Sequence, residues 1–283
     1  MLTVVLNSLV IITIWKDPFR NLKIISNYLI LNLAVSDFLL GMPGMLLFAL
    51  PHWFPHNSAL KRAADITLHL VCYASGLTIL ALAVERLIVI SFPLRSADYL
   101  TYSHLKLGML CIWLFAGFLA FLPVVKWDSF DRYRVASADA VVSLMIISLF
   151  ACYARIFFLV RKGLYRDLTT EVECEERRCL TENAREREKI KRRGRQVAFS
   201  VFILVGLFVV CWTPVIVLEN VNEFCRVKTV SATQMTSEVL RSLLLLHPLV
   251  NPIAYSLRTV KFRRALWTIF CSSNRGSQRQ HNV

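Results

Sequence analysis

Six apolar runs, each about 20 residues or longer, constrain the fold of this 283-residue chain more than any other feature. A helix of about 20 residues is long enough to cross the hydrocarbon core of a bilayer. The composition agrees, since 56% of the residues are hydrophobic and only 18% are charged. The runs occupy Ile24–Leu50, Ile66–Phe92, Leu105–Val125, Ala138–Val160, Val197–Val221 and Met235–Leu257.

A seventh apolar run extends from Met1 to Trp15 and is followed by Lys16. As a helix it would reach about 22 Å, which is short of the roughly 30 Å hydrocarbon core. We therefore expect a first helix that is truncated. A signal peptide is the competing interpretation, but the run lacks the basic start and the small-residue cleavage site of such a peptide.

The net charge of +14 would suggest nucleic acid as a partner of a soluble protein, so the placement of the basic residues decides the interpretation. With the N-terminus outside, Lys16, Arg95, Lys106 and the 161–195 segment lie on one side of the membrane. Basic loops favour the cytoplasm. The sequence thus predicts a multi-pass plasma-membrane protein with an extracellular N-terminus and a cytoplasmic C-terminus, whose basic side faces anionic lipid or a protein rather than nucleic acid.

The sequence also makes predictions for the segments that connect the apolar runs. Trp53 and the stretch Lys126–Asp139 are placed in short outer loops. The segment 163–195 is rich in Glu and Arg and is expected to form the third intracellular loop. Its part Glu171–Lys191 lacks a sustained hydrophobic stripe and is a solvated helical extension, a flexible loop or simply a charged linker.

The end of the chain has a different pattern. Apolar residues recur at helical spacing between Val260 and Phe270, beside Lys and Arg, which predicts a short amphipathic eighth helix at the membrane surface. Cys271 is a candidate for lipidation by palmitoylation. Residues 1–271 would then form the membrane domain and residues 272–283 a cytoplasmic tail.

Ionisable side chains inside two of the runs are informative because they are costly in hydrocarbon and usually mark functional positions. Glu85 and Arg86 precede Pro93 near the end of their run, either as an interfacial charge pair or facing neighbouring helices. Asp37 lies near the middle of its run, where an unpaired carboxylate would bind a proton or a cation. Ser75 lies about three helical turns before Glu85 and can face the same interior.

Other polar and aromatic residues leave alternatives open. Asn7 can bond to another helix or to its own backbone, and His69 can be a satisfied core histidine or line a cavity. Trp113 is interpreted as a packing residue. Tyr153 can turn inward or join the aromatic belt at the interface. Gly41, Pro43 and Gly44 together predict a kink.

These residues and motifs occur in a fixed order along the chain, and this order makes their combination much more specific than any one of them. In chain order they are Asn7, LAVSD ending at Asp37, ERL at 85–87, Trp113, Tyr153, CWTP at 211–214 and NPIAY at 251–255. The set resembles the rhodopsin-like (class A) G-protein-coupled receptors over essentially the whole chain after the shortened first helix. The resemblance implies an all-α membrane protein with a bundle of seven transmembrane helices and a short amphipathic eighth helix.

The resemblance also implies roles for single residues. Glu85 and Arg86 look like the Asp/Glu-Arg-Tyr motif, in which the acid holds the arginine at rest and the arginine meets the G protein in the active state. The other residues implied in coupling and switching are Tyr153, Trp212, Pro214, Asn251, Pro252 and Tyr255. Asp37, Ser75 and Asn251 look like the family's sodium pocket, so no cofactor is expected apart from an allosteric Na⁺ at Asp37 and Ser75.

The chain departs from the family's usual pattern at several positions. His247 and Pro248 occupy positions where the family usually has Asn and Ser. Gly194 occupies a position where many members have an acid that locks the arginine. Lys61 replaces the disulfide cysteine of the third helix, and Met145 replaces the proline of the fifth. The last two departures together resemble the branch that contains melanocortin, adenosine, cannabinoid and lysophospholipid receptors.

The same resemblance limits the classes of ligand that the protein can bind. The residues implied to line its pocket are Asp65, Leu68, His69, Cys72 and Trp212. Leu68 lies where amine receptors have an aspartate, which argues against a biogenic amine because a buried ammonium needs an anionic partner. The 235–257 run contains no lysine, which excludes a retinal Schiff base. A peptide, a nucleoside, a lipid or another small molecule remains.

The function implied is a receptor that binds an extracellular ligand and activates a heterotrimeric G protein through an outward movement of the sixth helix. A receptor-like decoy or scaffold that does not signal is the first alternative. An ion-coupled transporter is the second, although the spans show no internal repeat and only one mid-membrane acid. The sequence shows no nucleophile and base pair, metal cluster or phosphate loop, so an enzyme is not expected.

Overall fold

The computed structural model describes residues 2–20, 22, 24–54, 56–92, 95–124, 130–174, 206–217, 220–221, 247–253 and 262–269. Its labelled elements are the helices α1 (Leu2–Lys16), α2 (Ile25–Leu39), α3 (Met45–Trp53), α4 (Ser58–Ser91), α5 (Ser96–Tyr99), α6 (Tyr102–Phe121) and α7 (Phe130–Cys174), with the π-helical turn η1 (Leu40–Gly44) between α2 and α3. Residues 206–217, 247–253 and 262–269 are helical as well.

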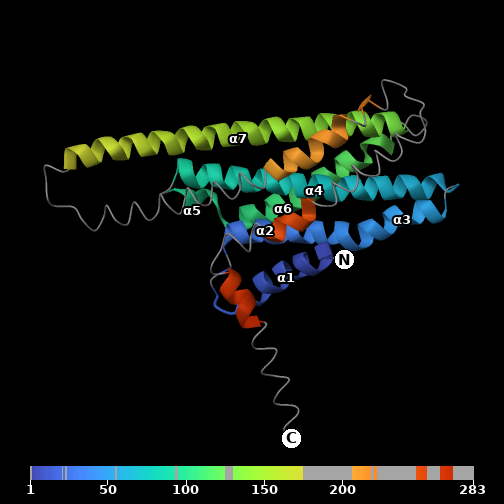
Figure 1. Ribbon diagram of the computed structural model, residues 1–283, viewed down its shortest axis with the longest axis horizontal. Helices are drawn as coiled ribbons and strands as arrows, with labels where there is room; N and C mark the ends of the chain where they lie inside the picture. The colour runs from blue at the N-terminus through green and yellow to red at the C-terminus, as the bar shows by residue number, and fades with distance from the viewer. Residues whose placement is uncertain are drawn as a thin grey trace, which may run out of the picture.

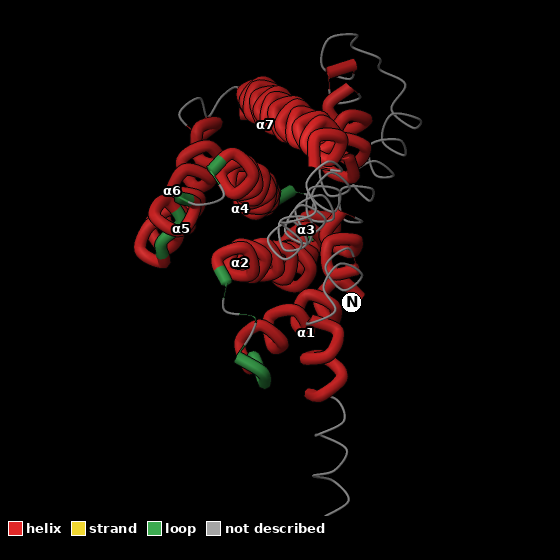
Figure 2. The backbone as a smooth tube through the Cα atoms, turned by 90° about the vertical axis from the view of Figure 1, so that its left-hand side faces the viewer, coloured by secondary structure: helices red, strands yellow, loops and turns green. Residues whose placement is uncertain are grey.

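Helix α4 lies in the middle of the bundle. Figure 1 shows the long helices side by side, and the view along them in Figure 2 places α2, α6 and α7 around α4. Ala74, Ile79 and Leu82 of α4 are fully buried. Since α4 contacts its neighbours on most of its sides, a side chain on almost any of its faces can meet another helix.

Among the described residues, four helical stretches are long and apolar enough to cross a membrane, namely Ile25–Met42, Ser58–Ser91, Tyr102–Val124 and Tyr133–Leu159. Leu2–Lys16 and Gly206–Val217 are shorter apolar helices. Only 17% and 22% of the apolar windows in the Tyr102–Val124 and Tyr133–Leu159 stretches are buried, against 56% in α4. Their outward faces are therefore apolar, as a lipid environment requires. These helices agree with an all-α membrane protein, while the complete seven-helix bundle and the eighth helix stay predictions.

Two segments that the sequence placed in loops are helical, so those predictions were wrong. Helix α7 begins at Phe130, inside the expected loop Lys126–Asp139, and no Gly or Pro interrupts the chain from there to Val160. Trp53 is the last residue of α3. At its other end α7 continues to Cys174, so residues 171–174 of the predicted extension are helical. The rest of that stretch lies outside the described residues.

The kink predicted at Gly41, Pro43 and Gly44 is confirmed. It takes the form of η1, a five-residue π-helical turn. Proline has no amide hydrogen for the helical ladder, and π-bulges are a common cause of helix bending. A Cβ at Gly41 would lie 3.1 Å from Val4 Cγ2, so the missing side chain also lets α1 approach the bend closely.

Candidate functional site

Glu85 and Arg86 form a buried ion pair near the end of α4. Arg86 Nε lies 3.0 Å from Glu85 Oε2, and the two side chains are 10% and 6% exposed. Ser26 of α2 donates a hydrogen bond of 2.9 Å to Glu85 Oε1, and Tyr153 of α7 is near enough to interact electrostatically with the guanidinium. The pair therefore faces neighbouring helices, while its depth in the membrane stays a prediction. The inward-turned alternative holds for Tyr153.

Asp37 is the centre of a second polar cluster. It is 1% exposed, and it accepts hydrogen bonds from Asn251 Nδ2 at 2.7 Å and from Ser75 Oγ at 3.3 Å. Both partners are buried, and the three residues come from α2, α4 and the 247–253 helix. A buried carboxylate is tolerated when its oxygens are hydrogen-bonded. The structure thus brings together the three residues that the sequence grouped around a sodium pocket.

Asn7 connects the first helix to this cluster. Its Nδ2 donates to Thr3 O at 2.9 Å and to Pro248 O at 3.1 Å, so both the local and the interhelical alternatives hold. Asn7 is fully buried. The second bond ties α1 to the helix that carries Asn251.

A third polar link was missed by sequence reasoning. Trp113 Nε1 of α6 donates to Asn32 Oδ1 at 3.0 Å, and Asn32 Nδ2 donates to Thr78 Oγ1 of α4 at 2.8 Å. Trp113 is therefore hydrogen-bonded as well as packed, which corrects the interpretation as packing alone. The signal was present in the sequence, because Asn32 is an amide within an apolar run, as Asn7 is.

An aromatic cluster joins α4, α7 and two later helices. The Phe208 ring lies 5.7 Å from the rings of both Trp212 and His247. A Cβ at Gly76 of α4 would lie 2.9 Å from Met145 Sδ and 3.2 Å from Phe208 Cε2. The absence of a side chain at Gly76 is what allows this approach. Sequence reasoning identified Trp212 and did not identify Gly76 or Phe208.

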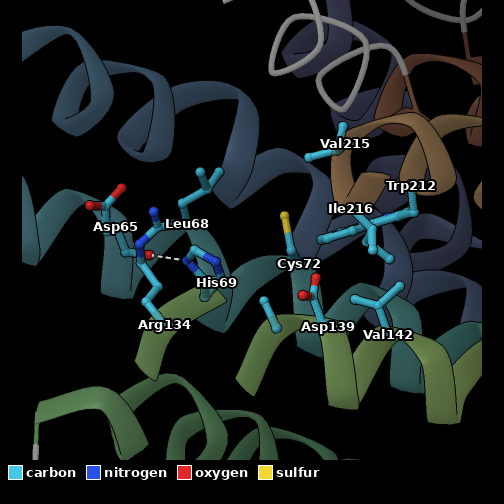
Figure 3. A pocket seen from close by; sticks show the side chains of 11 residues that line it. Asp65, Leu68, His69, Cys72, Arg134, Asp139, Val142, Trp212, Val215 and Ile216 are labelled. Carbon is cyan, nitrogen blue, oxygen red and sulfur yellow. Dashed lines mark hydrogen bonds between the residues drawn. The ribbon is translucent and has the colours of Figure 1, made fainter. Parts of the chain in front are cut away.

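A cavity lies beside Trp212, at the other end of α4 from Glu85 (Figure 3). It is lined by Asp65, Leu68, His69 and Cys72 of α4, by Arg134, Ala138, Asp139 and Val142 of α7, and by Trp212, Val215 and Ile216. All five residues predicted to line the ligand pocket are among them. His69 takes both of its predicted roles, because it lines the cavity and its Nδ1 is also satisfied by Asp65 O at 2.6 Å.

The cavity is small and carries charge. Its volume is about 30 Å³, enough for about two water molecules. Asp65 and Asp139 contribute carboxylates, and Arg134 reaches toward the turn of α4 that carries Asp65 (Figure 3). Asn220 Nδ2 donates to Asp139 Oδ2 at 2.6 Å. Sequence reasoning missed Arg134 and Asp139 because it placed both in a loop.

The Glu85–Arg86 pair, the Asp37 cluster, the Asn32 link and the aromatic cluster all involve α4, and the charged cavity lies toward its other end. The family described as 7 transmembrane receptor (rhodopsin family) matches residues 6–255, which is most of the chain. The chain belongs to the rhodopsin family of seven-transmembrane receptors. This receptor is therefore a multi-pass plasma-membrane protein of the signal-transduction class, and it is not an enzyme.

Relatives of the receptor include members of the branch expected from the sequence. It is 28% identical to somatostatin receptor type 4 of Rattus norvegicus, with 94% of this chain and 68% of the relative aligned. It is 23% identical to melanocortin receptor 5 of Rattus norvegicus, covering 94% and 79% of the two chains. It is 24% identical to adenosine receptor A2a of Equus caballus, covering 96% and 70%.

The remaining predicted site residues of the receptor divide into two groups. Pro214 and Pro252 lie in the described helices 206–217 and 247–253, and Pro252 is buried beside Asn251. Tyr255 and Cys271, together with Gly194, lie outside the residues that the structure describes. The switch and lipidation roles of Tyr255 and Cys271 stay predictions.

Proposed function

We propose that the receptor binds an extracellular ligand between α4, α7 and the 206–217 helix, and activates a heterotrimeric G protein when the 206–217 helix moves outward. The observation that carries the proposal is the double contact of Trp212. One indole lines the cavity and also packs against Phe208, whose ring meets the α4 backbone at Gly76. A change in the cavity is thereby transmitted to the middle of the bundle.

The cavity volume supports a coupling between ligand entry and helix movement. About 30 Å³ holds water but no receptor ligand. Trp212, Val215 and Ile216 form one wall. A ligand that enters between this wall and α4 displaces the 206–217 helix, and its affinity for the displaced arrangement drives the conformational equilibrium.

The Glu85 end of the bundle faces the cytoplasm in this proposal, and the N-terminus lies outside. The basic loops support this orientation through the positive-inside rule. At rest Glu85 holds Arg86 within the bundle, with Ser26 fixing the carboxylate. Separation of the helices frees the guanidinium to bind the G protein, which is a change between two discrete packings of the same helices.

Asp37, Ser75 and Asn251 fit an allosteric Na⁺. Hard cations bind oxygen, and these residues offer carboxylate, hydroxyl and amide oxygens in one buried cluster. Asn251 Oδ1 is buried and makes no hydrogen bond with any described residue, so it is an oxygen that a cation can use. A bound Na⁺ would supply positive charge beside Asp37 and hold α2, α4 and the 247–253 helix together.

Leu68 presents an apolar side chain to the cavity, at the position where the family's amine receptors have an aspartate. Two other carboxylates, Asp65 and Asp139, line the same cavity. The charged groups Asp65, Arg134 and Asp139 instead favour a ligand that carries polar or ionic groups of both signs. Peptides and nucleosides offer such groups.

The test compares ligand-independent G-protein activation in cells that express the receptor or its Arg86→Ala variant, across the Gα subtypes, at matched surface expression. We expect the signal to rise with receptor expression and to be lost in Arg86→Ala. Arg95→Ala, which removes an exposed basic residue at the same end, is the control and should signal normally. Equal signals from the receptor and Arg86→Ala contradict coupling through Arg86, and silence of both with every Gα favours the decoy.

A further inference from the structure

A short hydrogen bond joins α7 to the part of the chain that carries Trp212. Asn220 Nδ2 donates to Asp139 Oδ2 at 2.6 Å. The same nitrogen donates to Ile216 O at 2.9 Å, which attaches the Asn220 side chain to the 206–217 helix. Asp139 and Ile216 both line the cavity beside Trp212 (Figure 3). The bond therefore holds two walls of this cavity together.

The surfaces around this bond are apolar. Ala138 and Val142 of α7 line the cavity on one side, and Val215 and Ile216 line it on the other. Burial of aliphatic side chains is favourable but has no preferred direction. A hydrogen bond fixes the distance and the angle between its two groups. The bond from Asn220 to Asp139 is thus a directional contact that sets the spacing of the two walls.

The acceptor in this bond is charged, whereas the donor is neutral. A cationic donor makes a hydrogen bond to a carboxylate that is about twice as strong as a bond between neutral groups. Among the described residues that line the cavity, Asp65 and Asp139 carry carboxylates and Arg134 carries a guanidinium. Two acids against one cation leave an excess of negative charge. A cationic group that enters the cavity can therefore replace the amide at Asp139.

The size of the cavity links this replacement to a movement of the helix. A volume of about 30 Å³ holds about two water molecules. A ligand group that binds Asp139 needs the place that the Asn220 amide occupies at rest. Because the Asn220 side chain is attached to Ile216, its departure from Asp139 releases the wall that also contains Trp212.

We infer that Asn220 is a latch on the ligand cavity, and that the ligand opens it with a cationic group that replaces the Asn220 amide at Asp139. The inference rests on the proposed function, in which displacement of the 206–217 helix activates the receptor. The latch stabilises the resting arrangement, and the exchange at Asp139 couples recognition of the ligand to release of the helix. The cationic group binds against α7 rather than beside Leu68 of α4.

Two substitutions of Asn220 should act in opposite directions on thermal unfolding and on ligand-independent G-protein activation. Asn220→Leu removes the donor at similar size, so the unfolding temperature should fall and the signal should rise by about tenfold. Asn220→Lys brings an ammonium to Asp139, so the unfolding temperature should rise and the signal should fall. Val221→Lys adds the same charge at a neighbouring residue that is 40% exposed, and it should behave like the receptor.

Exchange of the two partners tests the bond itself. Asn220→Asp sets two carboxylates against each other and should raise the ligand-independent signal. Addition of Asp139→Asn restores a donor and an acceptor with their roles reversed, so the signal should return toward that of the receptor. A double variant that is as active as Asn220→Asp overturns the latch.

The charge of the ligand group is tested with propylguanidinium and propylurea, which have similar shapes and differ in charge. At millimolar concentrations, propylguanidinium should raise the unfolding temperature of the purified receptor and G-protein activation in membranes, because a bound probe stabilises the folded state. Propylurea should do neither, and Asp139→Asn should abolish the response to propylguanidinium. Equal effects of the two probes, or an undiminished response of Asp139→Asn, overturns the cationic ligand group.

The outcomes separate the latch from the proposed function. Thermal unfolding reports the Asn220 bond and the binding of the probe whether or not the receptor signals. Unfolding temperatures in the expected order, without G-protein activation by any variant, uphold the closure of the cavity by Asn220 and contradict the proposed function. Signalling that requires Arg86, with Asn220→Leu and Asn220→Lys both equal to the receptor, overturns the latch and leaves the proposed function intact.

Discussion

Gly76 is a position where the effect of adding a side chain can be estimated from the surrounding distances. In a Gly76→Ala variant the new methyl group would lie 2.9 Å from Met145 Sδ and 3.2 and 3.3 Å from Phe208 Cε2 and Cζ. The methionine side chain is flexible and can move. The Phe208 ring has less freedom, because it packs against both Trp212 and His247.

The expected cost is that of inserting one methyl group into a packed core, about 1 to 3 kcal/mol. The strain is relieved when the 206–217 helix moves away from α4. If the active arrangement includes this movement, Gly76→Ala shifts the resting-to-active equilibrium by the same energy, which is about 5- to 150-fold. The variant should therefore be less thermally stable and more active without ligand.

The assay measures thermal unfolding of the purified receptor and ligand-independent G-protein activation at matched surface expression. Gly117→Ala is the matched control, because the nearest atom to its Cβ would be Leu70 Cδ1 at 4.0 Å. In a double-mutant cycle with Met145→Ala, which removes the closest contact, Gly76→Ala should cost less than it does in the receptor itself. A Gly76→Ala receptor that unfolds and signals like the Gly117→Ala control would refute the packing account.

Three further results are expected. Trp113→Phe removes the bond to Asn32 and should lower thermal stability by about 0.6 to 1.7 kcal/mol, as scanning calorimetry can measure, whereas Trp267→Phe, at a residue 72% exposed, should not. Sodium chloride should raise the unfolding temperature relative to choline chloride, and Asp37→Asn should abolish the difference. Glu85→Gln leaves Arg86 without its partner and should raise ligand-independent activation by about tenfold or more, while Asp98→Asn, at an exposed acid, should leave it unchanged.

The sequence predicted the polar residues better than their partners. Asp37, Glu85 and Asn251 were recognisable because ionisable and amide groups are costly in apolar runs. The order of the motifs along the chain then indicated the protein family. Hydropathy cannot tell which groups meet across helices, since that depends on the rotation and relative height of each helix. The bond from Ser26 of α2 to Glu85 of α4 and the bond from Asn32 of α2 to Thr78 of α4 appear only in three dimensions.

The errors at the ends of helices have a different physical cause. Arg134 and Asp139 were assigned to a loop because the surrounding stretch is charged, yet α7 begins at Phe130. Charge marks the limit of a hydrocarbon-spanning segment rather than the limit of a helix, and a helix can continue past the membrane surface. Two charged residues of the cavity beside Trp212 were missed for this reason.

The contacts of α4 with α2 differ in kind from its contacts on the opposite side. Three polar bonds join α4 to α2, from Ser75 to Asp37, from Asn32 to Thr78 and from Ser26 to Glu85. They are spread over most of the shared length and are directional, so the α2 side resists sliding. On the opposite side Gly76 meets Met145 and Phe208 through apolar surfaces, which can slip without leaving a polar group unsatisfied. In the proposed function, a signal that enters beside Trp212 would then displace the 206–217 helix against a fixed α2 and α4 pair, and we expect the opening next to Arg86 and Tyr153.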